Sequence, residues 1–157
     1  MATRALVGYL NPETKELTST YNHYDGYPSN LGKALDDHYS DDSKAYGIAN
    51  YGYISYVDPE TGEIEAKHKE DADVEVLPNN FEDAMMNIAS LADSYGADFV
   101  YIYNPETKEW VIVKMYGKAQ TAETLGKFLS SLESNFGSNV EESYNAKWKN
   151  FINGKNN

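Results

Sequence analysis

Cysteine is absent from this chain of 157 residues. Disulfide bonds, zinc–thiolate centres and thiol catalysis are therefore excluded. Long apolar runs are absent too, because neither the first ten residues, MATRALVGYL, nor any later stretch is long enough for a signal peptide or a bilayer span. We therefore expect a cytoplasmic protein with no membrane contact, located in the host cytosol if the protein is viral.

Positive charge is scarce, since 13 lysines and arginines stand against 25 acidic residues and the net charge is −12. A chain without a basic stripe is repelled by phosphate backbones, so we expect no direct nucleic-acid binding. The acidity is densest in residues 58–83, which hold ten carboxylates against Lys67 and Lys69. It serves solubility alone, or it forms a surface that mimics DNA or binds a basic protein.

Tyrosine, by contrast, is abundant, with fourteen residues. Its ring with a polar tip suits both half-exposed sheet faces and recognition surfaces. The chain is long enough for one domain with a proper core. We predict a single α+β domain over residues 1–157, with residues 153–157 as a loose tail; the oligomeric state stays open.

One turn pattern occurs three times, as NPETKE at 11–16, DPETGE at 58–63 and NPETKE at 104–109. Asn or Asp followed by Pro is typical of a type I turn, and the fifth residue takes the left-handed position of a hairpin loop with a bulge. Strand-like residues flank each copy. The pattern therefore predicts three β-hairpins, and turn chemistry explains the recurrence without a functional repeat.

Helices are predicted between the hairpins from apolar spacing and capping residues. Their expected ranges are 29–39, 40–50, 81–95, 122–136 and 140–152, with Ser29 and Ser40 as the caps of the first two. The predicted class is α+β, an antiparallel sheet built from three β-hairpins with two long and two or three short helices packed on it. We expect the long helices to cover one face and the polar segment 68–80 to be a loop.

The sequence YNHYDGYPSNLGKAL, residues 21–35, concentrates polar and aromatic groups at a predicted strand-to-helix corner. Free amides at the start of the helix, with an imidazole and a carboxylate nearby, favour a pocket for a small anion or polar ligand. The candidate ligand-binding residues are His23, Asp25, Gly26, Tyr27, Ser29 and Gly32. The alternative is a structural corner held by a His23–Asp25 staple, with Asp25 at the helix amides.

No serine-nucleophile motif, P-loop or dinucleotide-binding fingerprint accompanies the cluster. The histidines His23, His38 and His68 lie in separate segments, without zinc-hydrolase spacing, and the acidic residues lack an EF-hand pattern. We therefore assign no catalytic residue, no metal and no cofactor.

The segment HYDGYPSNLG, residues 23–32, resembles an H-[YW]-D-G-Y-P-x-x-x-G signature of small uncharacterised proteins of phages and bacteria, notably marine and cyanobacterial phages. The similarity extends through LDDHYSDDSKAYGIANYGYIS and FEDAMMNIA. The resemblance implies a viral or mobile-element origin and no particular reaction. Its signature residues here are His23, Asp25, Gly26, Tyr27, Pro28 and Gly32.

Three functions remain open at this point. The leading hypothesis is a non-enzymatic phage accessory protein that binds a host protein or a small polar ligand in the host cytosol. The second is a small hydrolase or transferase that uses His23 and Asp25 for acid–base chemistry. The third is an acidic decoy that mimics DNA to capture a DNA-binding protein.

Overall fold

A computed structural model describes residues 3–76, 81–116 and 119–136. The strands are β1 (Ala5–Leu10), β2 (Glu16–Asn22), β3 (Tyr53–Ile54), β4 (Tyr56–Val57), β5 (Ile64–Glu65), β6 (Asp73–Val76), β7 (Phe99–Asn104), β8 (Glu109–Tyr116) and β9 (Ala119–Thr124). The helices are α1 (Lys33–His38), α2 (Asp42–Ala49), α3 (Phe81–Tyr95) and α4 (Leu125–Phe136), and a π-helical turn, Pro28–Gly32, precedes α1. The predicted helix 140–152 and the tail 153–157 lie outside the described residues.

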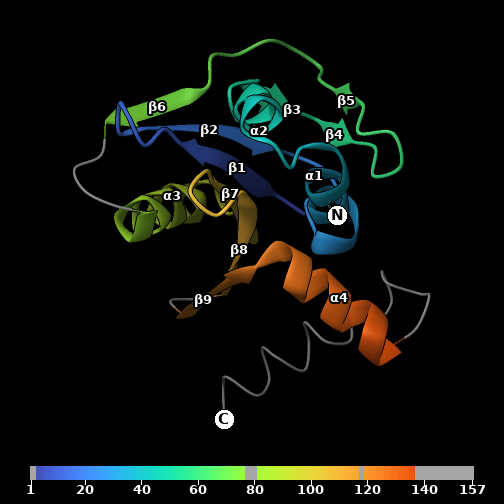
Figure 1. Ribbon diagram of the computed structural model, residues 1–157. Helices are drawn as coiled ribbons and strands as arrows, with labels where there is room; N and C mark the ends of the chain where they lie inside the picture. The colour runs from blue at the N-terminus through green and yellow to red at the C-terminus, as the bar shows by residue number, and fades with distance from the viewer. Residues whose placement is uncertain (1–2, 77–80, 117–118, 137–157) are drawn as a thin grey trace.

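The main sheet has the strand order β3-β2-β1-β7-β8-β9, and β6 pairs with β2 beside β3 (Figure 1). The pair β1–β7 is parallel, as is β2–β3, so the prediction of an antiparallel sheet is wrong. Parallel neighbours need a crossover connection, which the chain makes through α3 before it returns as β7 beside β1. The predicted combination of a sheet with packed helices is confirmed, whereas its layout is not.

All three turn patterns join antiparallel strands: β1–β2, β4–β5 and β7–β8. Lys15, Gly62 and Lys108 have φ values of 61°, 76° and 61°, the left-handed conformation predicted for the fifth residue. In each turn the first side chain accepts hydrogen bonds from the turn's own backbone, as Asn11 Oδ1 does from Glu13 N at 2.9 Å. The β4–β5 hairpin forms a separate two-stranded sheet, so the three hairpins do not share one sheet as predicted.

The helices lie on both faces of the main sheet. One core layer contains Val7, Tyr101 and other residues of β1 and β7, packed against α1, α2 and the start of α4. The opposite layer contains Leu6 and Ile102, packed against Ala84, Ile88 and Ala92 of α3. In Figure 1, α3 lies to the left of the sheet and α1 and α4 lie to the right. The expectation that both long helices cover one face is therefore wrong.

Two segments predicted as other structures are strands. Part of the expected loop 68–80 forms β6, which pairs antiparallel with Glu16–Ser19 of β2; residues 77–80 lie outside the described residues. Residues 119–124, of which 122–124 were expected to begin a helix, form β9 and pair antiparallel with residues 111–116 of β8. Both segments complete backbone hydrogen bonds of a neighbouring strand edge, a long-range requirement that local residue preferences do not reveal.

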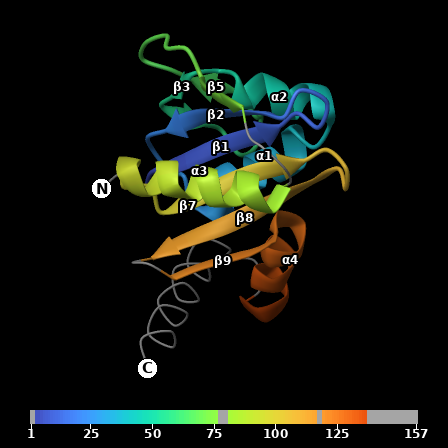
Figure 2. The same ribbon diagram turned by 90° about the vertical axis from the view of Figure 1, so that its left-hand side faces the viewer.

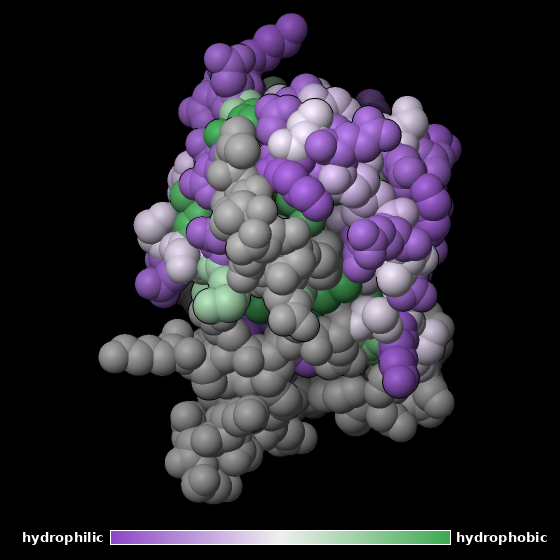
Figure 3. All heavy atoms as spheres, turned by 60° about the vertical axis from the view of Figure 1, so that its left-hand side comes forward, coloured by the Kyte–Doolittle hydropathy of each residue, from purple (hydrophilic) through white to green (hydrophobic). Residues whose placement is uncertain are grey.

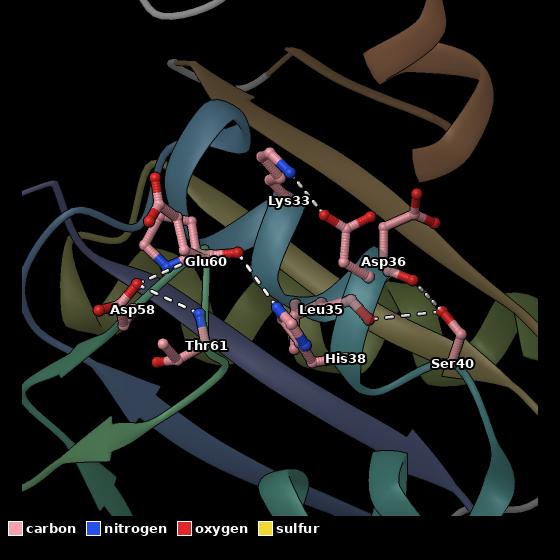
Figure 4. A network of polar contacts seen from close by, with 10 residues as sticks. Lys33, Leu35, Asp36, His38, Ser40, Asp58, Glu60 and Thr61 are labelled. Atoms are coloured by element: carbon pink, nitrogen blue, oxygen red, sulfur yellow. Dashed lines mark hydrogen bonds and ion pairs between the residues drawn. The ribbon is translucent and has the colours of Figure 1, made fainter.

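Helix α2 begins at Asp41, whose side chain accepts a hydrogen bond from Lys44 N at 2.7 Å. Ser40, the predicted cap, instead donates from its hydroxyl to Asp36 O at 2.6 Å (Figure 4). Helix α3 ends at Tyr95, the last residue of the predicted range, and Gly96 follows it with a φ of 69°. None of the helices in the described residues has the length and apolarity needed to cross a membrane.

Helix α1 is tied to the β4–β5 hairpin by His38 (Figure 4). Its Nε2 donates to Pro59 O at 3.2 Å. A Cβ on Gly62 would lie 2.8 Å from the His38 side chain, so a glycine is required there for close packing as well as for its positive φ. The hairpin is therefore docked on α1 although it does not join the main sheet.

Candidate functional site

Strand β2 ends at Asn22, and the chain then runs beside the end of β3 and the residue that follows it. His23 N donates to Ile54 O and Tyr24 N to Ser55 O, both at 2.9 Å. Backbone pairing therefore continues for two residues beyond β2, and the chain turns sharply at the next residue.

The turn itself is made by Asp25 and Gly26. Asp25 has a φ of 53°, a left-handed conformation that non-glycine residues seldom adopt. Gly26 is held on both sides, because its N–H donates to Thr3 O at 2.8 Å and its carbonyl accepts from Tyr101 Oη at 2.7 Å. A Cβ on Gly26 would lie 2.7 Å from Thr3 O and 2.8 Å from Ala5 Cβ. Gly26 is thus required by close packing against the start of β1.

The helix begins at Tyr27 with Pro28 as its first residue, and no side chain caps it. The ring of Pro28 fixes its φ at a value suited to the first residue of a helix. The helix boundary is therefore at Tyr27, two residues before the predicted cap, Ser29. Ser29 Oγ is buried and has no hydrogen-bond partner among the described residues. The predicted cap is therefore wrong.

The first turn is a π-helical turn in which Tyr27 O accepts from Asn30 N at 3.0 Å and Gly32 N at 3.5 Å. These two amides are consequently not available to an anion. Gly32 is buried, and a Cβ there would lie 3.1 Å from Leu125 Cδ1 and 3.3 Å from Tyr101 Cε1. Gly32 packs against α4 and β7 and does not leave an open approach to the helix.

His23 and Asp25 are not paired. His23 Nδ1 lies 2.7 Å from Tyr21 Oη, within hydrogen-bond distance. The Asp25 carboxylate makes no hydrogen bond or ion pair with the described part of the chain, and no side chain of this segment caps the helix. The expected staple between His23 and Asp25 is therefore wrong, as is the placement of Asp25 at the helix amides.

His23 instead belongs to a group of half-exposed rings from four segments. We call this group the aromatic surface, and it consists of Tyr21, His23, Tyr24, Tyr53, His68 and Tyr95. Tyr21 is at its centre, with ring centroids 5.1 Å from Tyr95, 5.7 Å from His23 and 6.0 Å from Tyr53. The exposed edges of the aromatic surface are Tyr24, which is 40% exposed, and Tyr95, which is 39% exposed.

Next to this surface is a cavity of about 320 Å³. It is lined by Tyr24, Ser55, Tyr56, Glu65, Ala66 and Lys67. Lys67 Nζ lies 5.8 Å from the centre of the Tyr24 ring, in cation–π geometry. Burial raises the pKa of Tyr56, with Asp58 and Asp25 adding to the rise. The lining of the cavity thus combines two tyrosine rings, the Lys67 ammonium and the Glu65 carboxylate.

Each of the three histidines has a different polar partner: His23 Nδ1 lies 2.7 Å from Tyr21 Oη, His38 Nε2 3.2 Å from Pro59 O, and His68 Nε2 3.1 Å from Glu70 Oε1. Within residues 3–76, 81–116 and 119–136, no three His, Asp or Glu side chains are grouped so that they could hold a metal ion. The arrangement at the corner therefore offers ring surfaces and hydrogen-bonding groups for binding.

Of the six candidate residues, the structure brings His23 to the aromatic surface, whereas Gly26 and Gly32 have packing roles. Tyr27 packs partly buried against the core. Sequence reasoning missed the contributions of Tyr53, His68 and Tyr95, which lie far from the motif in the chain. The sequence signal for Tyr53 and Tyr95 was the abundance of tyrosine, and His68 had none.

Comparison with protein-family models, with curated proteins and with solved structures finds no match to this chain.

Proposed function

We propose that the protein is a non-enzymatic binding protein that docks a positively charged segment of another protein on its aromatic surface. The observation that carries this proposal is the contact of six rings from four segments, with Tyr24 and Tyr95 about two-fifths exposed at its edges. Tyrosine is enriched at the energetic centres of protein interfaces, because a rigid ring supplies contact area and its hydroxyl supplies a hydrogen bond.

The charge around this surface favours a basic partner. Residues 58–76 contain eight carboxylates against Lys67 and Lys69. Two of these carboxylates contact rings of the aromatic surface, since Glu70 Oε1 lies 3.1 Å from His68 Nε2 and Asp73 Oδ2 accepts from Tyr95 Oη at 3.3 Å, whereas Arg4 donates to Tyr95 O at 3.3 Å. The coloured surface on the side of α3 is mostly hydrophilic, with small hydrophobic areas (Figure 3). Lys67 over Tyr24 already places an ammonium near a ring of this surface, the contact that an arginine or lysine of a partner would make.

The resemblance of HYDGYPSNLG to the phage signature supports a host-cell protein as this partner, and hence a phage accessory protein that acts in the host cytosol. A hydrolase or transferase that uses His23 and Asp25 has less support, because His23 Nδ1 lies against Tyr21 Oη and the pair is not formed. A DNA-mimic decoy remains the second candidate, because the carboxylates of residues 58–76 favour it; it requires the acidic side chains and not the rings.

The test is the binding of a fluorescently labelled Arg-Gly repeat peptide, measured by anisotropy. Tyr24→Ala and His23→Ala should each weaken binding about fivefold or more, the loss of one cation–π or ring contact. The matched control is Tyr51→Ala, which removes a tyrosine that is 44% exposed and has no ring contact with the aromatic surface; it should bind as the parent does.

The paired variant Glu60→Gln/Glu63→Gln separates the two candidates, because both side chains are exposed on the β4–β5 turn. Binding that is lost in this variant and unchanged in Tyr24→Ala would contradict the proposal and favour the decoy. A peptide in which glutamate replaces arginine should not bind, and equal binding of it would contradict a basic partner.

A further inference from the structure

At the other end of the sheet, the two NPETKE turns come together although they are 93 positions apart in the chain. The parallel pairing of β1 with β7 places their following turns side by side, and both project from one end of the sheet (Figure 2). Between them lies a cavity of about 430 Å³, which we call the turn pocket. It is lined by Tyr9, Asn11, Pro12, Glu13, Asp42, Pro105, Glu106 and Lys108. Its volume is in the range of pockets that hold small molecules.

Tyr9 is the buried polar group of this pocket. It is 8% exposed, and its ring is fixed by Tyr103, stacked at 5.9 Å, and by Tyr46, edge-on at 5.5 Å. Its hydroxyl has no hydrogen-bond partner among the described residues. The hydroxyl is not among the fully buried unpartnered atoms of the described residues, which are Asn22 Oδ1 and Ser29 Oγ. The hydroxyl at the pocket wall is therefore accessible to a ligand atom.

The charged groups of the turn pocket decide what kind of ligand fits. Asp42 accepts from Lys108 Nζ at 2.6 Å and from Tyr103 Oη at 3.1 Å, so its carboxylate is satisfied. Glu13 and Glu106, from equivalent positions of the two turns, have no hydrogen bond or ion pair to their carboxylates in the described part of the chain. The lining thus contains three carboxylates and one ammonium, so the pocket has an excess of negative charge.

From this geometry we propose that the turn pocket binds a small aliphatic cation with a primary ammonium or guanidinium group. The cationic end is held by Glu13 and Glu106, and one of its N–H groups donates to Tyr9 Oη. The methylene chain lies against the rings of Pro12 and Pro105. Lys108 on Asp42 is the internal example of the same recognition, an alkylammonium bound by a carboxylate of this pocket.

Two sources can supply such a group, a free diamine or the lysine side chain of another protein. The probes are therefore butane-1,4-diamine for the first source and N-acetyl-lysine amide for the second, with butane-1,4-diol as the neutral control. Binding is followed by amide chemical shifts of the isotope-labelled protein. We expect saturable shifts confined to residues 8–14, 41–44 and 103–109 with a cationic probe and none with the diol. The probe that binds more tightly identifies the source.

Three variants test the roles of the side chains. Tyr9→Phe keeps the ring stacking and removes the hydroxyl, so it should weaken binding about fivefold with an unchanged melting temperature. Tyr51→Phe, which removes a hydroxyl from an exposed ring that does not line the turn pocket, is the matched control and should bind as the parent does. Lys108→Gln frees an oxygen of Asp42 and should tighten binding.

Three outcomes would overturn the proposal: parent-like binding by Tyr9→Phe, equal binding of the diol, or shifts spread evenly over all acidic surfaces. Weaker binding by Lys108→Gln would overturn the assignment of a cation and point to an anionic ligand. None of these measurements uses the aromatic surface, so the turn pocket and the proposed function succeed or fail independently.

Discussion

The two ends of the sheet differ in what their most conspicuous sequences do. At the corner, HYDGYPSNLG contains glycines that let backbone segments pack closely: Gly26 lies against Thr3 and Ala5, and Gly32 lies against Leu125. At the turn end, NPETKE is explained by local turn chemistry, yet the two copies line the turn pocket. The segment HYDGYPSNLG therefore serves mainly the close packing of the corner. The two NPETKE turns, whose sequence is explained by turn formation alone, enclose a candidate binding site.

The largest effect on stability is expected for Gly26→Ala at the corner. If the corner is set by close packing, the added methyl group clashes with Thr3 O and Ala5 Cβ, and the free energy of unfolding should fall by about 3 kcal/mol. Chemical denaturation measures it. The matched control is Gly47→Ala in α2, where a Cβ meets nothing within 4 Å and helix propensity predicts a gain of about 0.5–1 kcal/mol. If Gly26→Ala lowers the free energy of unfolding no more than Gly47→Ala does, close packing at Gly26 does not set the corner.

At the turn end, the stability of the protein at alkaline pH tests the contact between Tyr103 and Asp42. Burial, together with the hydrogen bond to Asp42, raises the pKa of Tyr103 to about 12 from its usual 10.0. The folded state therefore keeps a proton that the unfolded state releases, so this contribution to stability is complete below about pH 10 and is lost as the pH rises to about 12. Tyr103→Phe should lose less stability over this interval. Parallel stability curves for the two proteins would show that Tyr103 does not titrate in this way.

The smallest effect on stability is expected when the same substitution is made in each of the two NPETKE turns. Lys15→Gly relieves a residue at a φ of 61° and should be neutral or stabilise by a few tenths to about 1 kcal/mol. Lys108→Gly gives the same relief but removes the ammonium bound to Asp42, so it should be less favourable than Lys15→Gly by about 0.5 kcal/mol. Thermal melts of both variants give the difference. Equal effects would mean that the contact of Lys108 with Asp42 contributes nothing to stability.

The sequence by itself determined the features that depend on neighbouring residues. Asn or Asp before Pro predicted all three hairpin turns, including the left-handed residues Lys15, Gly62 and Lys108, because a turn is held by hydrogen bonds within its own few residues. The apolar spacing of residues 81–95 predicted α3 for the same reason, since a helix closes its backbone hydrogen bonds locally. At the corner, the sequence identified a bend, whereas the half-buried position of His23 beside Tyr21 came from the tertiary structure.

Only the tertiary structure decided which segments meet. The parallel pairing of β1 with β7 and the position of β6 on the edge of β2 follow from the need to satisfy strand edges across long loops, which no local pattern records. The aromatic surface joins Tyr21 to Tyr95, and the turn pocket joins Tyr9 to Lys108, across most of the chain. Capping was decided in the same way, because the helix start was set by Pro28 and the packing of Gly26 and not by the hydroxyl of Ser29.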